Sequence, residues 1–536
     1  MARALYNDQT IEYHNNRWSK TRNYASVLRN CRKYLKKGAL VIIMEYIIRR
    51  LTQLFSKKAG VSMANIALGS PTKEFFVEML TRDIELNDAI LDLLDNCLDG
   101  VVRSCSDKDK LHSADFYASY SANISISATE FSITDNCGGI PRETAENYAF
   151  RMGRVPTTQT DHPTIGIYGI GMKRAIFKIG RAATVYTQND GQKYAVKIPC
   201  DWADTGDWNF PIEENPQNDS LNMNGTRVHI TALNPSIAEL WNTTENLNAF
   251  VETLKKAIQE SYSLIIQKGF TITINDQTVT ANPVELLVQK DGDKKGIRPY
   301  VFTGEYDDVS VKVAIGFYAP MASDDDIDEM NESKRSSYEA GITVVCNDRV
   351  VLYNDKSGLT GWGTNGVPNY HTQFIGIKGI VVFESTNPKA LPMTTTKRGI
   401  DHSSALYIAV KDKICEGLKM FTNYTNQWKG RNAQERTFST AAQKVQYSDL
   451  FTETAKTDFG VSPRRDARGY GQTFRPVLPV PENEKPFKII RYSRNAEDIK
   501  LLVGYFYGDK EEEVNPSVIG EKCFDKVLEE VKRQEV

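Results

Sequence analysis

Three glycines, Gly166, Gly169 and Gly171, stand directly before Lys173 and a run with apolar residues at helical spacing. Glycines at the start of a helix let backbone N–H groups approach an anion without interference from a Cβ atom, and the helix N-terminus adds partial positive charge. Lys173 adds a full positive charge at the same place. The residue types and their spacing predict a phosphate-binding turn, although glycine-rich turns also precede helices that bind no ligand.

Carboxylates and an amide gather on a second predicted helix, in residues 85–100. At about 100° per residue, the apolar residues supply a buried side and the polar residues share one arc. The arc contains Asp92, Asp95, Asn96 and Asp99. It has two interpretations: the solvated acidic face of an ordinary amphipathic helix, or a set of side chains that face a ligand.

A third polar group follows a predicted hairpin, residues 121–134, in which apolar and polar residues alternate. The second strand runs directly into Asp135, and Gly138 and Gly139 follow closely. A strand that ends in an Asp and two glycines brings a carboxylate and bare backbone to the edge of a sheet. The alternative is a plain turn built from an Asx residue and glycines.

The segments between these groups mix helices and strands. Residues 141–165 form a long polar connection with little periodicity, a pattern typical of a functional lid or of disorder. Two strands are predicted after the glycine turn, and a further strand at 224–233 opens with Gly225 and Thr226. Residues 236–265 are predicted to be mostly helical, and short strands follow.

Length and composition exclude several classes of protein. A chain of 536 residues predicts two to four domains, and 40% hydrophobic with 25% charged residues is ordinary for a soluble globular protein. The formal charge of −2 gives no global reason to expect a nucleic acid partner. The eight cysteines form no CxxC pair, which argues against a disulfide scaffold or a zinc site and favours a reducing cytoplasm.

The first sixty residues differ from the rest in charge, with 13 Lys and Arg against three acidic residues. The most apolar run, 39–48, is short and contains Glu45, so no membrane span is predicted. Residues 1–62 have two interpretations. They form a basic amphipathic extension that touches an anionic surface or a partner, or they are a leader outside the working protein, whose natural start is then Met63.

Five features follow one another along the chain: an acidic helix with Asn, a strand ending in D-x-x-x-G, a lid, a G-x-x-G-x-G turn and a G-T strand. Together they resemble the GHKL ATPase superfamily, which includes Hsp90, MutL-type mismatch-repair proteins, type II topoisomerase subunits, histidine kinases and MORC proteins. The stretch YGIGMK is most similar to the MORC and MutL form. The resemblance implies an α+β fold, a two-layer α/β sandwich known as the Bergerat ATP-binding fold, in a domain spanning 63–265.

The resemblance also implies a role for each matching residue. Asn96 would coordinate Mg²⁺, which prefers hard oxygen ligands. Asp135 would accept a hydrogen bond from the amino group of adenine, Gly139 would let the base pack against backbone, and Thr226 would share a water with Asp135. The triphosphate of ATP would be held by Gly166, Gly169, Gly171 and Lys173.

Two positions depart from the family pattern. Asp92 stands where the general base is usually Glu, one methylene longer. Because misplacing a catalytic group by about 1 Å can slow a reaction on the order of a hundredfold, we expect slow hydrolysis. Cys137 replaces the first glycine of the D-x-G-x-G box, so we expect a rearranged turn at the nucleotide.

The second half of the chain resembles the S5-like transducer domain of MutL and topoisomerase subunits, over residues 266–428. In those families a lysine on a Thr-Lys loop reaches the γ-phosphate, and Lys397 matches it; a solvated loop lysine is the alternative. Residues 403–428 are predicted to form one amphipathic helix. Residues 429–486 are predicted to be a Pro- and Arg-containing linker, with a nucleic-acid-contacting strip at 452–486 as the alternative. Residues 487–536 are predicted to be a small C-terminal segment of unassigned role that ends in a helix.

The expected function is therefore an ATP-gated homodimer of MORC or MutL type that uses Mg²⁺ and ATP, hydrolyses ATP slowly, and acts on DNA or in genome defence. The DNA partner rests on analogy alone. An Hsp90-like chaperone ATPase is the first alternative, and a nucleotide-binding module without turnover is the second. A histidine kinase is disfavoured, because His14 is the only histidine upstream of the motifs.

Overall fold

The computed structural model describes residues 71–105, 113–153, 169–217, 221–289, 296–321, 338–394, 396–454, 460–461, 469–481, 493–508 and 514–534. The interpretations of residues 1–62 and the role given to Gly166 lie outside these residues, as does the part of the predicted lid at 154–165. The chain divides into two compact units, Met1–Phe75 and Phe76–Val536. Every contact between side chains described below lies within the second unit.

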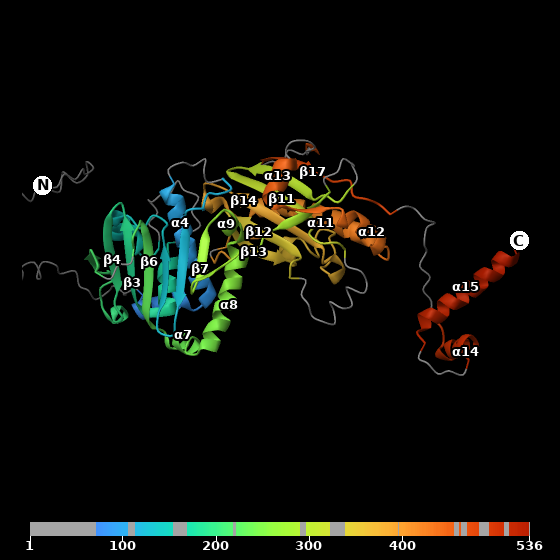
Figure 1. Cartoon of the computed structure of the whole chain (residues 1–536), viewed down its shortest axis with the longest axis horizontal. Helices are drawn as coiled ribbons and strands as arrows, with labels where there is room; N and C mark the ends of the chain where they lie inside the picture. The colour runs from blue at the N-terminus through green and yellow to red at the C-terminus, as the bar shows by residue number, and fades with distance from the viewer. Residues whose placement is uncertain are drawn as a thin grey trace, which may run out of the picture. The chain divides into compact units, whose positions relative to one another are not determined.

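The first sheet has eight strands in the order β5-β4-β3-β6-β2-β1-β7-β8 (Figure 1). All neighbouring strands are antiparallel except β1 and β7, which run parallel. The strands are β1 (Ser121–Ile126), β2 (Phe131–Asp135), β3 (Gly180–Asn189), β4 (Gln192–Ile198), β5 (Ile212–Glu214), β6 (Gly225–Leu233), β7 (Thr271–Ile274) and β8 (Gln277–Thr278). The predicted hairpin and the strand at 224–233 are confirmed.

Helices form a layer against this sheet. They are α3 (Lys73–Thr81), α4 (Leu86–Ser104), α5 (Arg142–Thr144) with η4 (Ala145–Ala149), α6 (Gly171–Ile179), η5 (Trp202–Asp204), α7 (Pro235–Leu240), α8 (Thr244–Ser261) and α9 (Ser263–Gln267). The core between the layers includes Ile90 and Leu94 of α4, Ile176 of α6, and Ile124 and Phe131 of the sheet, all buried. The apolar side predicted for residues 85–100 thus packs as expected.

The second sheet has seven strands in the order β13-β12-β14-β11-β10-β17-β16, with only β12 and β14 parallel. The strands are β10 (Tyr300–Tyr306), β11 (Val309–Phe317), β12 (Gly341–Cys346), β13 (Arg349–Asp355), β14 (Ile377–Glu384), β16 (Gly460–Val461) and β17 (Gly469–Phe474). Helix α11 (Ala405–Gln427) covers one face through Ile414, Leu418 and Phe421, which confirms the helix predicted at 403–428.

The other face of the second sheet is covered by a two-stranded sheet of β9 (Glu285–Val288) and β15 (Gln443–Gln446), together with α13 (Tyr447–Thr454). Short helices connect the strands: η6 (Gly358–Thr360), η7 (Thr372–Phe374), η8 (Pro388–Ala390) and α12 (Asn432–Thr440). Both β15 and β17 belong to sheets, although residues 429–486 were predicted to be a linker. Along the pairing of β17 with β10, Gly471 lies opposite Gly304, and the ring of Phe302 fills the space beside both glycines.

Two helices end the chain, α14 (Ala496–Tyr507) and α15 (Pro516–Gln534), and Lys526 of α15 contacts Tyr505 of α14. The predicted C-terminal helix is therefore confirmed. The α+β class is confirmed as well, since helices lie against a mixed sheet in the first half and the second half adds its own. Within the described residues, no helix has the length and apolar character needed to cross a bilayer.

Candidate nucleotide site

Helix α4 carries its acidic arc into the protein interior. Asp92, Asp95 and Asp99 are 4%, 1% and 4% exposed. The interpretation of this arc as a solvated acidic face is therefore wrong. Carboxylates are almost never buried to this degree unless cations or hydrogen-bond donors compensate them, so their partners define the site.

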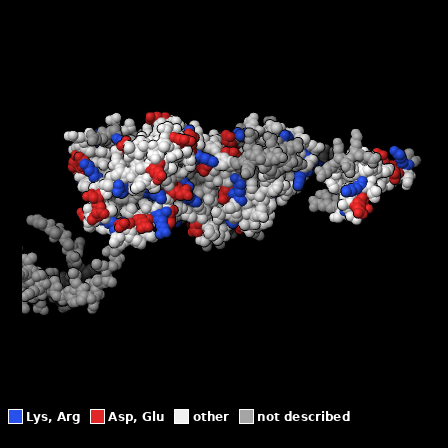
Figure 2. All heavy atoms as spheres, turned by 90° about the horizontal axis from the view of Figure 1, so that it is seen from below, with Lys and Arg blue, Asp and Glu red and all other residues white. Residues whose placement is uncertain are grey.

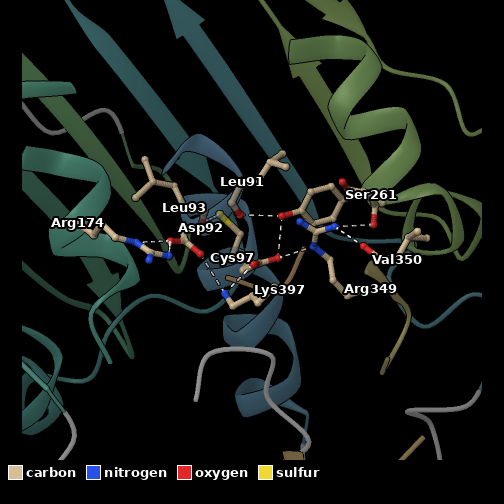
Figure 3. A network of polar contacts seen from close by, with 11 residues as sticks. Leu91, Asp92, Leu93, Cys97, Arg174, Ser261, Arg349, Val350 and Lys397 are labelled. Carbon is tan, nitrogen blue, oxygen red and sulfur yellow. Dashed lines mark hydrogen bonds and ion pairs between the residues drawn. The ribbon is translucent and has the colours of Figure 1, made fainter. Parts of the chain in front are cut away.

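Asp92 is held between two cations that come from different segments (Figure 3). Arg174, on α6, donates from Nε to Oδ2 at 3.1 Å and from Nη2 to the same oxygen. Lys397 donates from Nζ to Oδ1 at 3.2 Å. Gly171 begins α6 beside this carboxylate, because a Cβ atom built on it would lie 3.4 Å from Cβ and Cγ of Asp92. The glycine turn and the acidic helix therefore meet.

Asp95 lies one turn further along and has three partners. Oδ2 accepts from Lys397 Nζ at 2.7 Å, while Oδ1 accepts from Arg349 Nε at 3.0 Å and from the Tyr262 hydroxyl at 2.7 Å (Figure 3). Burial raises the pKa of the Asp95 carboxyl, but Lys397 and Arg349 more than offset this, and the net pKa is lowered. The same pairing raises the pKa of Lys397 although its burial acts to lower it. The pair is therefore fully ionised at neutral pH.

Asn96 has a buried side-chain amide nitrogen with no hydrogen-bond partner. An unpaired buried amide is expensive, so such a group indicates a site for a ligand that the protein itself does not supply. The unpaired atom is the amide nitrogen, a hydrogen-bond donor that suits a phosphate oxygen, whereas the amide oxygen of the same side chain is the type of ligand that Mg²⁺ prefers. Within the described residues, no cluster of three or more His, Cys, Asp or Glu side chains could hold a metal by itself. A metal held through the Asn96 amide oxygen would therefore need further oxygen ligands, such as water or phosphate.

Asp135 ends β2 and lies beside the start of β6. Its Oδ1 accepts from the backbone N–H of Cys137 at 2.8 Å and of Thr226 at 3.2 Å. Burial raises the pKa of the Asp135 carboxyl, and these two N–H groups and the Cys97 side chain oppose the rise. The sequence-based pairing of Asp135 with Thr226 thus corresponds to a direct contact through the Thr226 backbone. Both backbone N–H groups reach the same oxygen, so neither of them engages the second carboxylate oxygen, Oδ2.

The turn after Asp135 is tight, and glycine is required in it. Gly139 has a φ of +75°, and a Cβ atom there would overlap the carbonyl oxygen of Gln188 on β3. Cys137, which replaces a family glycine, is 1% exposed. It fits because α4 carries Gly100 opposite, where a Cβ atom would lie only 2.6 Å from the Cys137 carbonyl oxygen. The helix therefore makes room for the turn.

The glycine turn before α6 is described from Gly169 onward. Gly169 has a φ of +67°, a conformation that side chains with a Cβ rarely adopt. Lys173 is 2% exposed, and its ammonium donates to the carbonyl oxygens of Ala149, at 2.8 Å, and Gly169. Burial lowers the pKa of Lys173 to about 8. In this structure Lys173 thus ties the glycine turn to the end of η4.

Lys397 comes from the second half of the chain and is 8% exposed, so the interpretation as a solvated loop lysine is wrong. Its φ is +58°, the left-handed region that costs a side chain of this kind of order 1 kcal/mol or more. Such a conformation persists where surrounding contacts hold it, and the ion pairs with Asp92 and Asp95 supply them. The structure therefore brings Lys397 to the acidic helix that carries Asp92 and Asp95.

Three residues of the site carry no family motif and were not singled out from the sequence: Arg174, Tyr262 and Arg349. Arg174 follows Lys173 directly, so its position beside the glycine turn was visible. Arg349 follows Asn347 and Asp348, residue types typical of a turn, but nothing local indicates that this turn reaches α4. Tyr262 ends α8 with no pattern to mark it.

Comparison with known proteins agrees with this geometry. Residues 84–227 match the family model described as histidine kinase-, DNA gyrase B-, and HSP90-like ATPase. The match includes α4, the β2 turn, the glycine turn and the first residues of β6, and it ends before Arg349 and Lys397. A search of curated proteins found no match to the chain.

Proposed function

We propose that the chain is an ATP-gated switch of MORC and MutL type with slow turnover, because residues 84–227 match the family model of histidine kinase-, DNA gyrase B- and HSP90-like ATPases. We propose that this domain spans 63–265 and that 266–428 form an S5-like transducer. The buried free cysteines Cys97, Cys137, Cys346 and Cys415 support a cytoplasmic location.

We assign ATP to the space between Asn96 and the glycine turn. Asp135 accepts from the adenine amino group, Gly139 gives the base access to backbone, and the N–H groups at the start of α6 face the phosphates. Bound Mg²⁺ would neutralise phosphate charge, with the Asn96 amide oxygen among its ligands. Asp92 orients water at the γ-phosphate as the general base.

The observation that carries the proposal is the contact of Lys397 with Asp92 and Asp95. A lysine that reaches the acidic helix from the second half of the chain lies where a γ-phosphate would compete for its ammonium. ATP supplies that phosphate and ADP does not, so the position of Lys397 depends on the nucleotide. The coupling of this loop to the second sheet then transmits the state of the site.

Dimerisation provides the test. Light scattering of the full chain with a non-hydrolysable ATP analogue should give twice the mass found with ADP, and Lys397→Met should remove the difference. Lys389→Met serves as the control, because Lys389 is an exposed lysine of the same connection. If Lys397→Met dimerises with the analogue as the unaltered protein does, Lys397 is not the sensor.

One observation favours a second candidate, a nucleotide-binding module without turnover. Both oxygens of Asp92 are engaged by cations, which weakens a general base. Phosphate release by Asp92→Asn separates the two candidates. General-base catalysis predicts a loss of about a hundredfold or more with ATP affinity retained, whereas equal release by both proteins supports the module.

The distribution of charge on the surface gives little support to the proposal that the protein binds DNA. On the face shown in Figure 2, Lys and Arg are interspersed with Asp and Glu, with no continuous basic band over the described residues. Arg475, from the predicted basic strip, pairs with Glu416. We therefore propose DNA binding in the ATP state alone. A gel shift of duplex DNA with the ATP analogue but not with ADP, weakened by salt, is the expected result; no shift in either state contradicts it.

A further inference from the structure

The two oxygens of Asp95 serve different partners. Oδ2 accepts only from Lys397, at 2.7 Å, among the contacts described here. Oδ1 accepts from Arg349 at 3.0 Å and from Tyr262 at 2.7 Å. The carboxylate is 1% exposed, so side chains of the protein rather than solvent supply its partners. Oδ2 thus faces Lys397, the proposed sensor, whereas Oδ1 faces Arg349 and Tyr262, which are not part of the sensor.

Arg349 is fixed in place on every side. It begins β13, is 2% exposed, and donates from Nη1 to the carbonyl oxygens of Ser261, at 3.1 Å, and Val350, at 2.8 Å. Its guanidinium carbon lies 4.3 Å from the centroid of the Tyr262 ring. Arg349 therefore cannot follow Lys397.

The residue before it anchors the same turn. Asp348 accepts from Lys268 Nζ at 2.8 Å on both oxygens and lies 3.5 Å from the Tyr117 hydroxyl. The β12–β13 turn is thus joined by ion pairs to the segment after α9 and to α4. Lys397, by contrast, lies on the connection after η8, and its φ of +58° is strained. Loss of its ion pairs with Asp92 and Asp95 would let the backbone relax.

Removing one partner of a buried ion pair is strongly unfavourable, because it leaves an uncompensated charge in a medium of low dielectric constant. If Lys397 were the only cation on Asp95, a γ-phosphate would have to overcome that penalty to draw Lys397 away. A ligand shifts a two-state equilibrium only by its differential affinity for the two states. The penalty would therefore reduce the preference of the site for ATP over ADP.

We propose that Arg349 is a positioning residue that keeps Asp95 neutralised when Lys397 leaves it, so that a γ-phosphate can recruit Lys397 at little penalty. Arg349 acts through Asp95, the carboxylate that its Nε contacts. The inference rests on the proposed function, because it requires Lys397 to be the sensor. It adds a second residue from outside the matched ATPase domain to the mechanism.

Calorimetric titration of the full chain with a non-hydrolysable ATP analogue and with ADP tests the proposal. In Arg349→Met, affinity for the analogue should fall by about tenfold, equivalent to about 1.4 kcal/mol, while affinity for ADP stays within about twofold. Arg349→Lys, which retains the charge, should restore most of the preference. Equal losses for both nucleotides would assign Arg349 a merely structural role and overturn the proposal.

The Asp95→Asn background supplies a second test that does not depend on the stability of Arg349→Met alone. An amide needs no counter-charge, so adding Arg349→Met to Asp95→Asn should leave the ratio of the two affinities unchanged. A further fall in that ratio contradicts the proposal. If the unaltered protein itself does not prefer the analogue over ADP, the Lys397 sensor fails and the proposal falls with it. If that preference exists and survives Arg349→Met, only the role of Arg349 is refuted.

Discussion

Replacement of Asp135 by Asn should change which base the site prefers. The backbone N–H groups of Cys137 and Thr226 both donate to Oδ1, so in the variant they hold the amide oxygen at that place. The amide nitrogen then takes the position of Oδ2. A donor would face the adenine amino group, which is itself a donor, whereas the O6 atom of guanine would find a partner.

One hydrogen bond to a charged group is worth about 1.5–3 kcal/mol, and Oδ2 is the one oxygen that the backbone leaves to the base. We therefore expect ATP affinity to fall by about ten- to a hundredfold in Asp135→Asn, with a smaller loss or a gain for GTP. Competition of ATP and GTP for a fluorescent ATP analogue measures both. Thermal unfolding without nucleotide controls for a loss of fold.

The pH dependence of the same variant gives an internal check. Burial raises the pKa of Asp135, so ATP binding by the unaltered protein should weaken as the pH falls through that raised value and the carboxyl is protonated. Asp135→Asn cannot titrate and should lack this loss. If the variant binds ATP as tightly as the unaltered protein and still rejects GTP, Asp135 does not contact the base.

Two further predictions concern stability. Gly139→Ala should lower the free energy of unfolding in urea by about 2 kcal/mol or more, because the new Cβ atom combines a positive φ with overlap on Gln188. Gly191→Ala is the control: its φ is +77° but the space around it is open, so it should lose only about 1 kcal/mol. Equal losses would mean that β3 shifts to accommodate the added methyl group. Lys173 has a pKa of about 8 in the folded protein against 10.5 ordinarily, so between these pH values only the unfolded chain retains the proton. The free energy of unfolding, relative to that of Lys173→Met, should therefore rise with pH over this interval, by about 3 kcal/mol in all. If the free energies of the two proteins change with pH in parallel, the pKa of Lys173 is not lowered in the folded protein.

The local part of the site was predictable from the sequence, since Asp92, Asn96 and Asp135 occur in short patterns tied to a helix or a strand end. The burial of the acidic arc was not. Asp95 is neutralised by Arg349, 254 residues away in the sequence, and no local pattern encodes that pairing. An acidic helix face is therefore predicted to be solvated, because the sequence alone does not show which distant cations pack against it.

The segment 429–486 shows a second limit. Its glycines and prolines favour a linker, because glycine weakens a strand and proline interrupts one. The strand β17 forms nevertheless, since β10 offers hydrogen-bonding edges and the ring of Phe302 packs where Gly471 and Gly304 have no side chains. The glycines that argued against a strand are the residues that admit the aromatic ring.

The central claim is that a triphosphate lies between Asn96 and the glycine turn, with its metal on the Asn96 side. Titration of ATP with and without Mg²⁺, in the unaltered protein and in Asn96→Ala, tests it most directly. If the triphosphate lies there, Mg²⁺ should strengthen ATP binding to the unaltered protein by about tenfold or more, and Asn96→Ala should lose this gain while it keeps the metal-free affinity. An equal gain from Mg²⁺ in both proteins would contradict it.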